Sequence, residues 1–175
     1  MANDLALLII DVQAEMFSLP EQPHRSTQLL QEIARLADRA RAASIPVIYV
    51  RHDGGAGHPL EKGTSGWEIH DSIAPKNDDR IVEKRFSNSF EKTDLREILN
   101  SLVVSKLLVT GLQTEYCVGA TSLAARSLGY EVTVVTDAHS TFNGPVVPAE
   151  GMIEHCYRIF GERGVHMIPA RELQF

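Results

Sequence analysis

The sequence predicts an α/β fold in three layers, with a doubly wound, mainly parallel sheet of six strands between helices on both faces. Short apolar runs alternate along the chain with longer segments of helical periodicity. The first run, residues 5–10, is apolar at every position, as is typical of a parallel strand buried on both faces. Strands separated by helices form right-handed crossovers, which place helices on both faces of one sheet.

Each element follows from its own pattern. Strands are expected at 5–10, 45–50, 80–83, 106–111, 130–136 and 165–168. Helices are expected at 26–43 with Ser26 as the cap, at 93–102, at 115–128 with Gly129 after the end, and at 148–160. Residues 51–76 contain five glycines and no periodicity, so they predict a long loop of the kind that is often functional.

Composition limits the classes of function. A chain of 175 residues predicts one domain over residues 1–175. The net charge is −6, from 17 basic and 23 acidic residues, which predicts no nucleic-acid partner and suits a small neutral or cationic substrate. No apolar run is long enough to cross a membrane. The two cysteines and an N-terminus without a signal-peptide pattern predict a cytoplasmic protein.

Three chemically useful side chains follow three separate predicted strands, namely Asp11, Lys84 and Cys117. The carboxyl ends of parallel strands meet at one edge of a sheet, so we expect these side chains to lie together. There Cys117 would begin a helix, where a thiolate is stabilised, while an acid and a cation could assist it. Each residue also has a structural reading, as an inert core thiol, a turn-forming acid and a solvated lysine.

The segments Asp11-Val-Gln13, Val82–Phe86 and Gly111–Val118 together resemble the isochorismatase-like cysteine hydrolase superfamily, which includes nicotinamidases and carbamoylsarcosine amidase. The resemblance covers about residues 5–140. It implies a catalytic triad with Cys117 as nucleophile, Asp11 as base and Lys84 as electrostatic partner. It also implies a cis peptide bond before Gln113 and an oxyanion hole formed by the N–H groups of Gln113 and Cys117. We further expect a homo-oligomer, either a dimer or a tetramer.

The retained cysteine predicts hydrolysis of an amide or a related C–N bond of a small molecule through a thioester. Isochorismatases that cleave a vinyl ether often lack this cysteine, so that reaction is an alternative. A second alternative is a non-catalytic or redox-sensing binding protein on the same fold. A cysteine phosphatase is excluded because the first arginine after Cys117 is Arg126, not the sixth residue.

No metal or other cofactor is expected. Metal-bearing nicotinamidases have an Asp-x-His pattern, whereas this chain has His52 before Asp53, followed by His58 and His70. These four residues remain the alternative ligand set. The predicted substrate pocket consists of Gln13, Phe17, Trp67, Phe86, Tyr116 and His139. As structural alternatives, the two phenylalanines could be core, Trp67 could fix its loop, and His139 could cap a turn.

Overall fold

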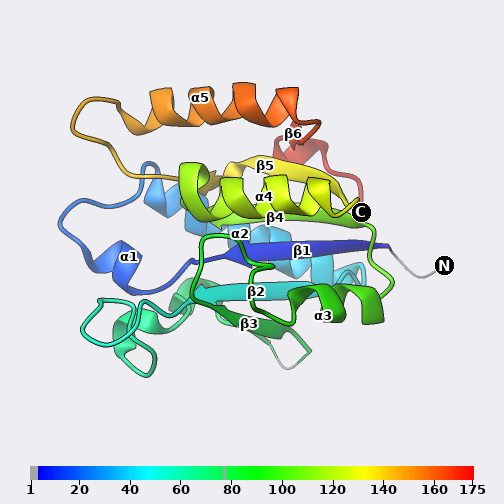
Figure 1. Cartoon of the computed structure of the whole chain (residues 1–175), viewed down its shortest axis with the longest axis horizontal. Helices are drawn as coiled ribbons and strands as arrows, with labels where there is room; N and C mark the ends of the chain where they lie inside the picture. Colours follow the sequence, from blue (N-terminus) through cyan, green and yellow to red (C-terminus); the bar gives the residue numbers. More distant parts are fainter. Residues whose placement is uncertain (1–3, 77) are drawn as a thin grey trace.

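The computed structural model describes residues 4–76 and 78–175, and a six-stranded parallel sheet forms its centre (Figure 1). The strands lie in the order β3-β2-β1-β4-β5-β6. Their bounds are β1 (Leu5–Ile10), β2 (Val47–His52), β3 (Arg80–Lys84), β4 (Lys106–Leu112), β5 (Glu131–Ser140) and β6 (His166–Ile168). The order changes direction beside β1, so the switch point lies between β1 and β4. The predicted fold class is confirmed.

Helices cover both faces of the sheet. The helices α3 (Leu95–Ser101), α4 (Gly119–Ser127) and α5 (Ala149–Glu162) lie on one face, and α2 (Ser26–Ala42) lies on the other (Figure 1). Side chains of β1 alternate between these layers, because Leu8 and Ile10 join the first core cluster while Leu7 and Ile9 join the second. The apolar run that predicted this strand therefore reflects burial on both faces.

Several element ends differ from the prediction. The strand expected at 45–50 lies two residues later and ends at His52, with pairing to β1 from Val47 onward. Ser26 does not cap α2, since its hydroxyl binds the Gln22 side chain at 2.8 Å and Arg25 precedes the helix in a left-handed conformation. The short helix α1 (Glu15–Ser18) was not predicted because four residues show no periodicity.

The helix expected to begin at residue 115 starts instead with a single π-helical turn, Thr114–Val118, and α4 follows it. A π turn carries one extra residue per turn and is frequent at functional sites. The π turn follows the end of β4 and contains Cys117. Among the described residues, no helix combines the length and the apolar character needed to cross a membrane.

The long loop after β2 is ordered and folds back toward β1. It contains short 3-10 turns at Ser65–Trp67 and Asp71–Ile73, and Ile69 forms an antiparallel bridge with Gln13. The loop lies near α1 at the carboxyl ends of β1 and β2 (Figure 1). It therefore forms part of the wall at the edge of the sheet where the candidate residues emerge.

Candidate active site

The structure brings Asp11, Lys84 and Cys117 into direct contact. Lys84 Nζ donates a hydrogen bond of 2.7 Å to Asp11 Oδ2 and one of 3.1 Å to Cys117 Sγ. The side chains of Lys84 and Asp11 are 0% and 6% exposed, so this ion pair is shielded from water. We call these three residues the Asp-Lys-Cys cluster.

Local backbone geometry positions each member of the cluster. Asp11 directly follows β1 and has a φ of 52°, a left-handed conformation that aspartate tolerates better than most residues. Lys84 is the last residue of β3 and lies opposite His52 in the register with β2. The peptide bond between Leu112 and Gln113 is cis, as the resemblance implied, and the π turn with Cys117 follows it.

The electrostatics of the cluster favour a neutral thiol and a charged lysine. Burial raises the pKa of Cys117 to about 12, and the charge of Asp11 adds to this effect while Lys84 opposes it. Burial alone would lower the pKa of Lys84, but the charge of Asp11 and the hydrogen bonds to Asp11 and Cys117 raise it above its usual value. Burial therefore opposes the thiolate that the start of a helix would stabilise, and the thiol needs a base to take its proton.

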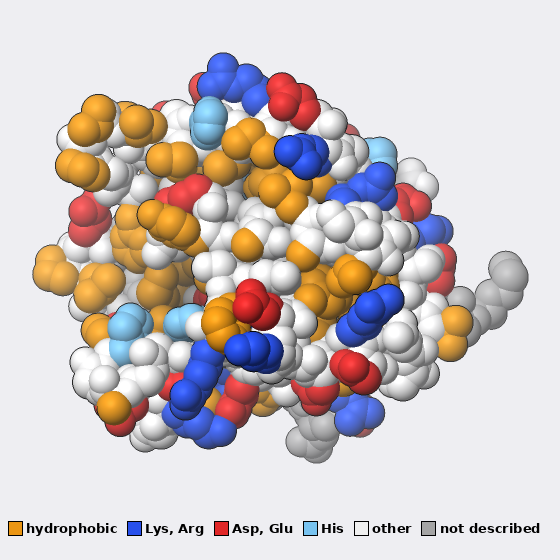
Figure 2. Space-filling view, viewed as in Figure 1, with side chains coloured by type: hydrophobic (Ala, Val, Ile, Leu, Met, Phe, Trp, Pro, Cys, Tyr) orange, Lys and Arg blue, Asp and Glu red, His pale blue; other side chains and the backbone are white. Residues whose placement is uncertain are grey.

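A cavity of about 380 Å³ lies beside Cys117, a size that suits a small molecule. Figure 2 shows apolar side chains gathered at the left of the view, the end at which α1 lies, with histidine side chains beside them. The cavity is bordered by the apolar side chains of Met16, Leu19, Pro59, Leu60 and Leu112. Its polar lining residues, besides Asp11 and Cys117, are Glu15, His52, His58, Ser87, Gln113 and Tyr116.

Of the six predicted pocket residues, only Tyr116 lines this cavity. Phe17 packs against the ring of His70, with centroids 4.9 Å apart. Trp67 is buried beneath Arg51, whose Cζ lies 3.4 Å from the ring centroid. Phe86 borders a different hollow beside Arg85. These aromatic residues stabilise the surroundings of the cavity in the described chain and do not form its wall.

His139 lies behind the π turn that contains Cys117. Its Nδ1 is 2.8 Å from Thr114 Oγ1, and its Nε2 is 2.8 Å from the Tyr157 hydroxyl. It borders a hollow of about 770 Å³ between α2 and α5, and Cys117 does not line that hollow. His139 was predicted either to line the substrate pocket or to cap a turn. In the structure it connects α5 to the π turn.

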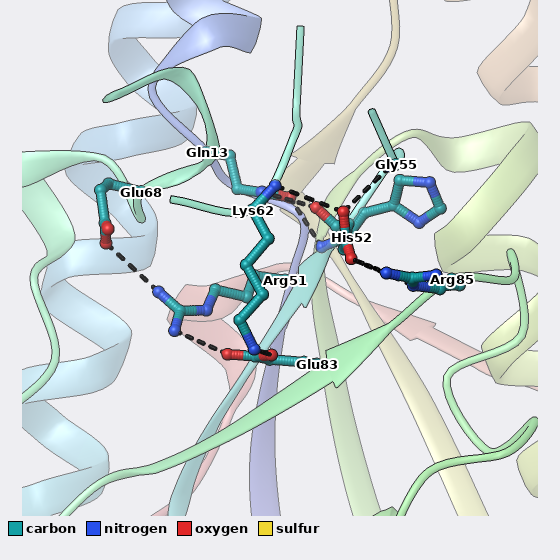
Figure 3. Close-up of polar contacts among 9 residues, drawn as sticks. Gln13, Arg51, His52, Gly55, Lys62, Glu68, Glu83 and Arg85 are labelled. Carbon is teal, nitrogen blue, oxygen red and sulfur yellow. Dashed lines mark hydrogen bonds and ion pairs between the residues drawn. The ribbon is translucent and has the colours of Figure 1, made fainter. Parts of the chain in front are cut away.

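Gln13 and a set of ion pairs attach the long loop to the sheet (Figure 3). The Gln13 amide donates to the carbonyls of His52 and Trp67, at 3.0 and 2.8 Å, and accepts from the His52 N–H at 2.9 Å. The ion pairs that hold the loop are Asp53–Arg85, Lys62–Glu83 and Arg51–Glu68, and Arg51 also pairs with Glu83 of the neighbouring strand β3. Gln13 is thus a buried connector that supports the cavity from behind.

Sequence reasoning missed His52 as a wall residue. It lies at the carboxyl end of β2 and faces the same edge as Lys84, its register partner. Burial, followed by the charge of Lys84, lowers the pKa of His52. A strand predicted to continue two residues beyond Val50 would have placed it there. The wall residues from α1 and from the loop carry no such signal in the sequence.

Three of the four residues considered as metal ligands are engaged in other contacts, although the rings of His52 and His58 lie 6.3 Å apart. Asp53 accepts hydrogen bonds from Arg85 at 2.7 Å and from the Gly55 N–H at 2.9 Å. His58 Nδ1 accepts from the Leu60 N–H at 3.0 Å, and His70 Nδ1 accepts from the Ser72 N–H at 3.2 Å. Within residues 4–76 and 78–175, no three histidine, cysteine or acidic side chains are grouped to hold a metal ion.

Comparison with known proteins identifies a family that this chain matches. A family model described as the isochorismatase domain matches residues 5–150. Streptothricin hydrolase of Streptomyces noursei is 34% identical over 143 residues, which are 82% of this chain and 52% of the relative. Nicotinamidase 3 of Arabidopsis thaliana is 32% identical over 152 residues, covering 79% of this chain and 74% of the relative.

A solved structure is similar over nearly the whole chain. The crystal structure of an isochorismatase from Pseudomonas putida KT2440 has a TM-score of 0.92 and 28% identity, covering 98% of this chain and 90% of that one. The chain spans about half the length of the streptothricin hydrolases that it matches, 52% and 57%. The family match and these relatives confirm the resemblance that the three strand-end motifs carried. The chain therefore belongs to the isochorismatase family, whose members are hydrolases and include amidases.

Proposed function

We propose that this protein is a cysteine-dependent hydrolase that cleaves an amide or a related C–N bond of a small molecule. The observation that carries the proposal is the position of Lys84 Nζ, which contacts both Asp11 Oδ2 and Cys117 Sγ at the edge of a small cavity. A nucleophile, a base and a cation in contact are the groups that acyl transfer needs. The resemblance of the chain to a nicotinamidase further supports an amide as substrate.

The first half of the proposed reaction forms a thioester. Asp11 Oδ1 is buried and has no hydrogen-bond partner among the described residues, so it is available to accept the thiol proton. The sulfur of Cys117 attacks the carbonyl carbon, and the π electrons of the carbonyl move to its oxygen. We assign stabilisation of that oxyanion to the N–H groups of Gln113 and Cys117, as the resemblance implies. The C–N bond then breaks, and the leaving amine takes the proton from Asp11.

The second half releases the acid. Water attacks the thioester carbon while Asp11 accepts a proton from it, and the C–S bond breaks to give a carboxylic acid. The sulfur recovers its proton from Asp11, which restores the starting state. Lys84 keeps its charge throughout and compensates the negative charge that develops on the sulfur, which the raised pKa of Lys84 favours.

The test is a screen of primary amides for ammonia release by the wild-type protein and by Cys117→Ala. We expect Cys117→Ala to abolish turnover while the fold persists, since no other side chain in the cluster can form the thioester. Cys156→Ala is the control, because Cys156 lies on the buried face of α5 and does not line the cavity. Hydrolysis at the wild-type rate by Cys117→Ala would exclude the covalent mechanism.

Asp11 and Lys84 should act as one unit with Cys117. We expect Asp11→Asn and Lys84→Ala each to lower kcat by orders of magnitude, and the double variant to be little slower than either. Removing one partner of a buried ion pair is also destabilising, by roughly 3–5 kcal/mol. Circular dichroism must therefore establish that each variant is folded before rates are compared. Additive losses in folded variants would contradict a shared role.

A further inference from the structure

The cavity beside Cys117 contains a carboxylate that the reaction does not use. Glu15 is the first residue of α1, is half-buried, and lines the cavity. It makes no hydrogen bond or ion pair with any group of residues 4–76 and 78–175. Other acidic side chains nearby are engaged, since Asp53 pairs with Arg85 and Glu68 pairs with Arg51 (Figure 3).

The long loop packs closely against Glu15. A Cβ atom at position 66 would lie 2.8 Å from Glu15 Oε2 and 2.7 Å from the Pro59 carbonyl oxygen. Only glycine at this position leaves room for the carboxylate beside the loop. Pro59 and Glu15 both line the cavity, so this part of the loop and the start of α1 form neighbouring parts of its wall. Glu15 is thus part of a packed site and not of the open surface.

Glu15 is also the uncompensated charge of the cavity. The carboxylate of Asp11 is neutralised by Lys84 at 2.7 Å, and the thiol of Cys117 is uncharged. Burial lowers the pKa of His52, which favours its neutral form, and His58 Nδ1 accepts a hydrogen bond from the Leu60 N–H. Glu15 is therefore the lining carboxylate of this cavity that has no cationic partner among the described residues, whereas Asp11 has Lys84.

The remaining wall suits an apolar molecule that carries a cation. The aliphatic side chains of Met16, Leu19 and Leu60 exclude water, which strengthens the attraction between opposite charges. Tyr116 lines the cavity and is 60% exposed, so its ring is open to a ligand. Organic cations bind well beside an aromatic face and a carboxylate.

We propose that Glu15 selects substrates with an organic cation, an ammonium or guanidinium group, within the molecule that bears the scissile amide. The reaction part of this statement rests on the proposed hydrolase function, whereas charge selection is a property of the cavity itself. A purely structural role for Glu15 also exists, because an acidic residue in a first helical turn interacts favourably with the helix dipole. That role would leave charge selection unaffected.

The first experiment measures charge selection without a known substrate. Three methanethiosulfonate reagents of similar size convert a thiol to a mixed disulfide, and they carry a trimethylammonium group, a sulfonate group or no charge. The rate at which each charged reagent modifies Cys117 is measured by peptide mass spectrometry and divided by the rate measured with the neutral reagent. In the wild-type protein we expect the cationic reagent to react faster than the anionic one. We expect Glu15→Gln to reduce the ratio of the cationic rate to the anionic rate about tenfold.

Glu21→Gln is the matched control, since it removes the same charge from a nearby exposed side chain that does not line the cavity. Its ratio should equal that of the wild type, and Glu15→Lys should reverse the preference. Equal ratios in the wild type and Glu15→Gln would overturn the proposal.

The second experiment compares primary amides that end in a trimethylammonium group or in its uncharged isostere, a tert-butyl group. Wild-type kcat/KM should be about tenfold or more higher for the cationic amide, and Glu15→Gln should remove the difference. If the reagents reveal charge selection but neither amide is cleaved, charge selection stands and the hydrolase proposal fails. If both amides are cleaved equally and the reagent ratio does not respond to Glu15→Gln, the hydrolase proposal stands and the role of Glu15 is wrong.

Discussion

His139 illustrates how a single buried residue couples the helix α5 to the π turn that contains Cys117. It contacts Thr114 of the π turn on one side and Tyr157 of α5 on the other, each at 2.8 Å. Complete burial lowers the pKa of its imidazole to about 4. The neutral ring can donate at one nitrogen and accept at the other, which satisfies both hydroxyl partners. Protonation would remove the acceptor and leave a buried charge.

This arrangement predicts a loss of stability in acid. Because the folded-state pKa is below the ordinary value of 6.5, the unfolded chain binds the proton more readily, and stability falls as the pH decreases from about 6.5 toward 4. Between pH 8 and pH 5 the expected loss from His139 is about 2 kcal/mol. Urea denaturation at both pH values should reveal a smaller acid-side loss in His139→Gln. An unchanged loss in that variant would contradict the interpretation.

At the scale of the elements, the contact between β1 and β4 determines where the π turn with Cys117 begins. Gly111 lies one residue before the end of β4 and has a φ of 110°. A Cβ atom there would lie 2.0 Å from the carbonyl oxygen of Ile10, the residue before Asp11. Close approach of the two strands at this point therefore requires glycine, and it brings the turn with Cys117 near Asp11.

Gly111→Ala should destabilise the protein by more than about 3 kcal/mol, because both the backbone conformation and the contact with Ile10 oppose a side chain. Gly129→Ala provides the matched control. Gly129 also has a positive φ, 95°, but a Cβ atom there meets nothing within 4 Å, so a loss of only about 1–2 kcal/mol is expected. Denaturant midpoints measure both losses. Equal destabilisation would rule out the interstrand contact as the cause.

The same scale explains which elements the sequence could predict. Buried parallel strands are apolar on both faces, so the runs predicted at 5–10 and 106–111 are visible without a structure, and their ends led to Asp11 and Cys117. Lys84 followed the end of the shorter strand predicted at 80–83. The helix α1 is too short to produce a period. The π turn was read as ordinary helix because Thr114–Val118 has the composition of a first helical turn. The sequence pattern does not reveal the π turn, because the extra residue in the turn changes the backbone geometry without changing the residue types.

At the scale of the whole molecule, the cavity wall depends on contacts between distant segments. Pro59 and Leu60 reach Cys117 because the loop folds back onto β1, where Gln13 binds the carbonyls of His52 and Trp67. No local pattern encodes that path. The predicted aromatic wall was therefore placed by proximity in sequence, whereas Trp67 turns toward Arg51 and is buried outside the cavity.

The distribution of ligand-type side chains over the whole molecule leads to the last prediction, that hydrolysis does not depend on a divalent metal. Asp53 is held by Arg85, His58 is held by the Leu60 N–H, and His70 packs against Phe17. Of the four candidates, His52 and His58 line the cavity, with ring centroids 6.3 Å apart, and His52 Nδ1 has no hydrogen-bond partner in the described chain. Two histidines fall short of the three or four protein ligands that zinc sites usually have. Exhaustive dialysis against EDTA should leave kcat/KM for any amide found in the screen unchanged, with Cys117→Ala as the inactive reference. Loss of activity after chelation, with recovery on adding zinc or iron, would show that the loop rearranges to bring His58 or Asp53 to a metal beside His52.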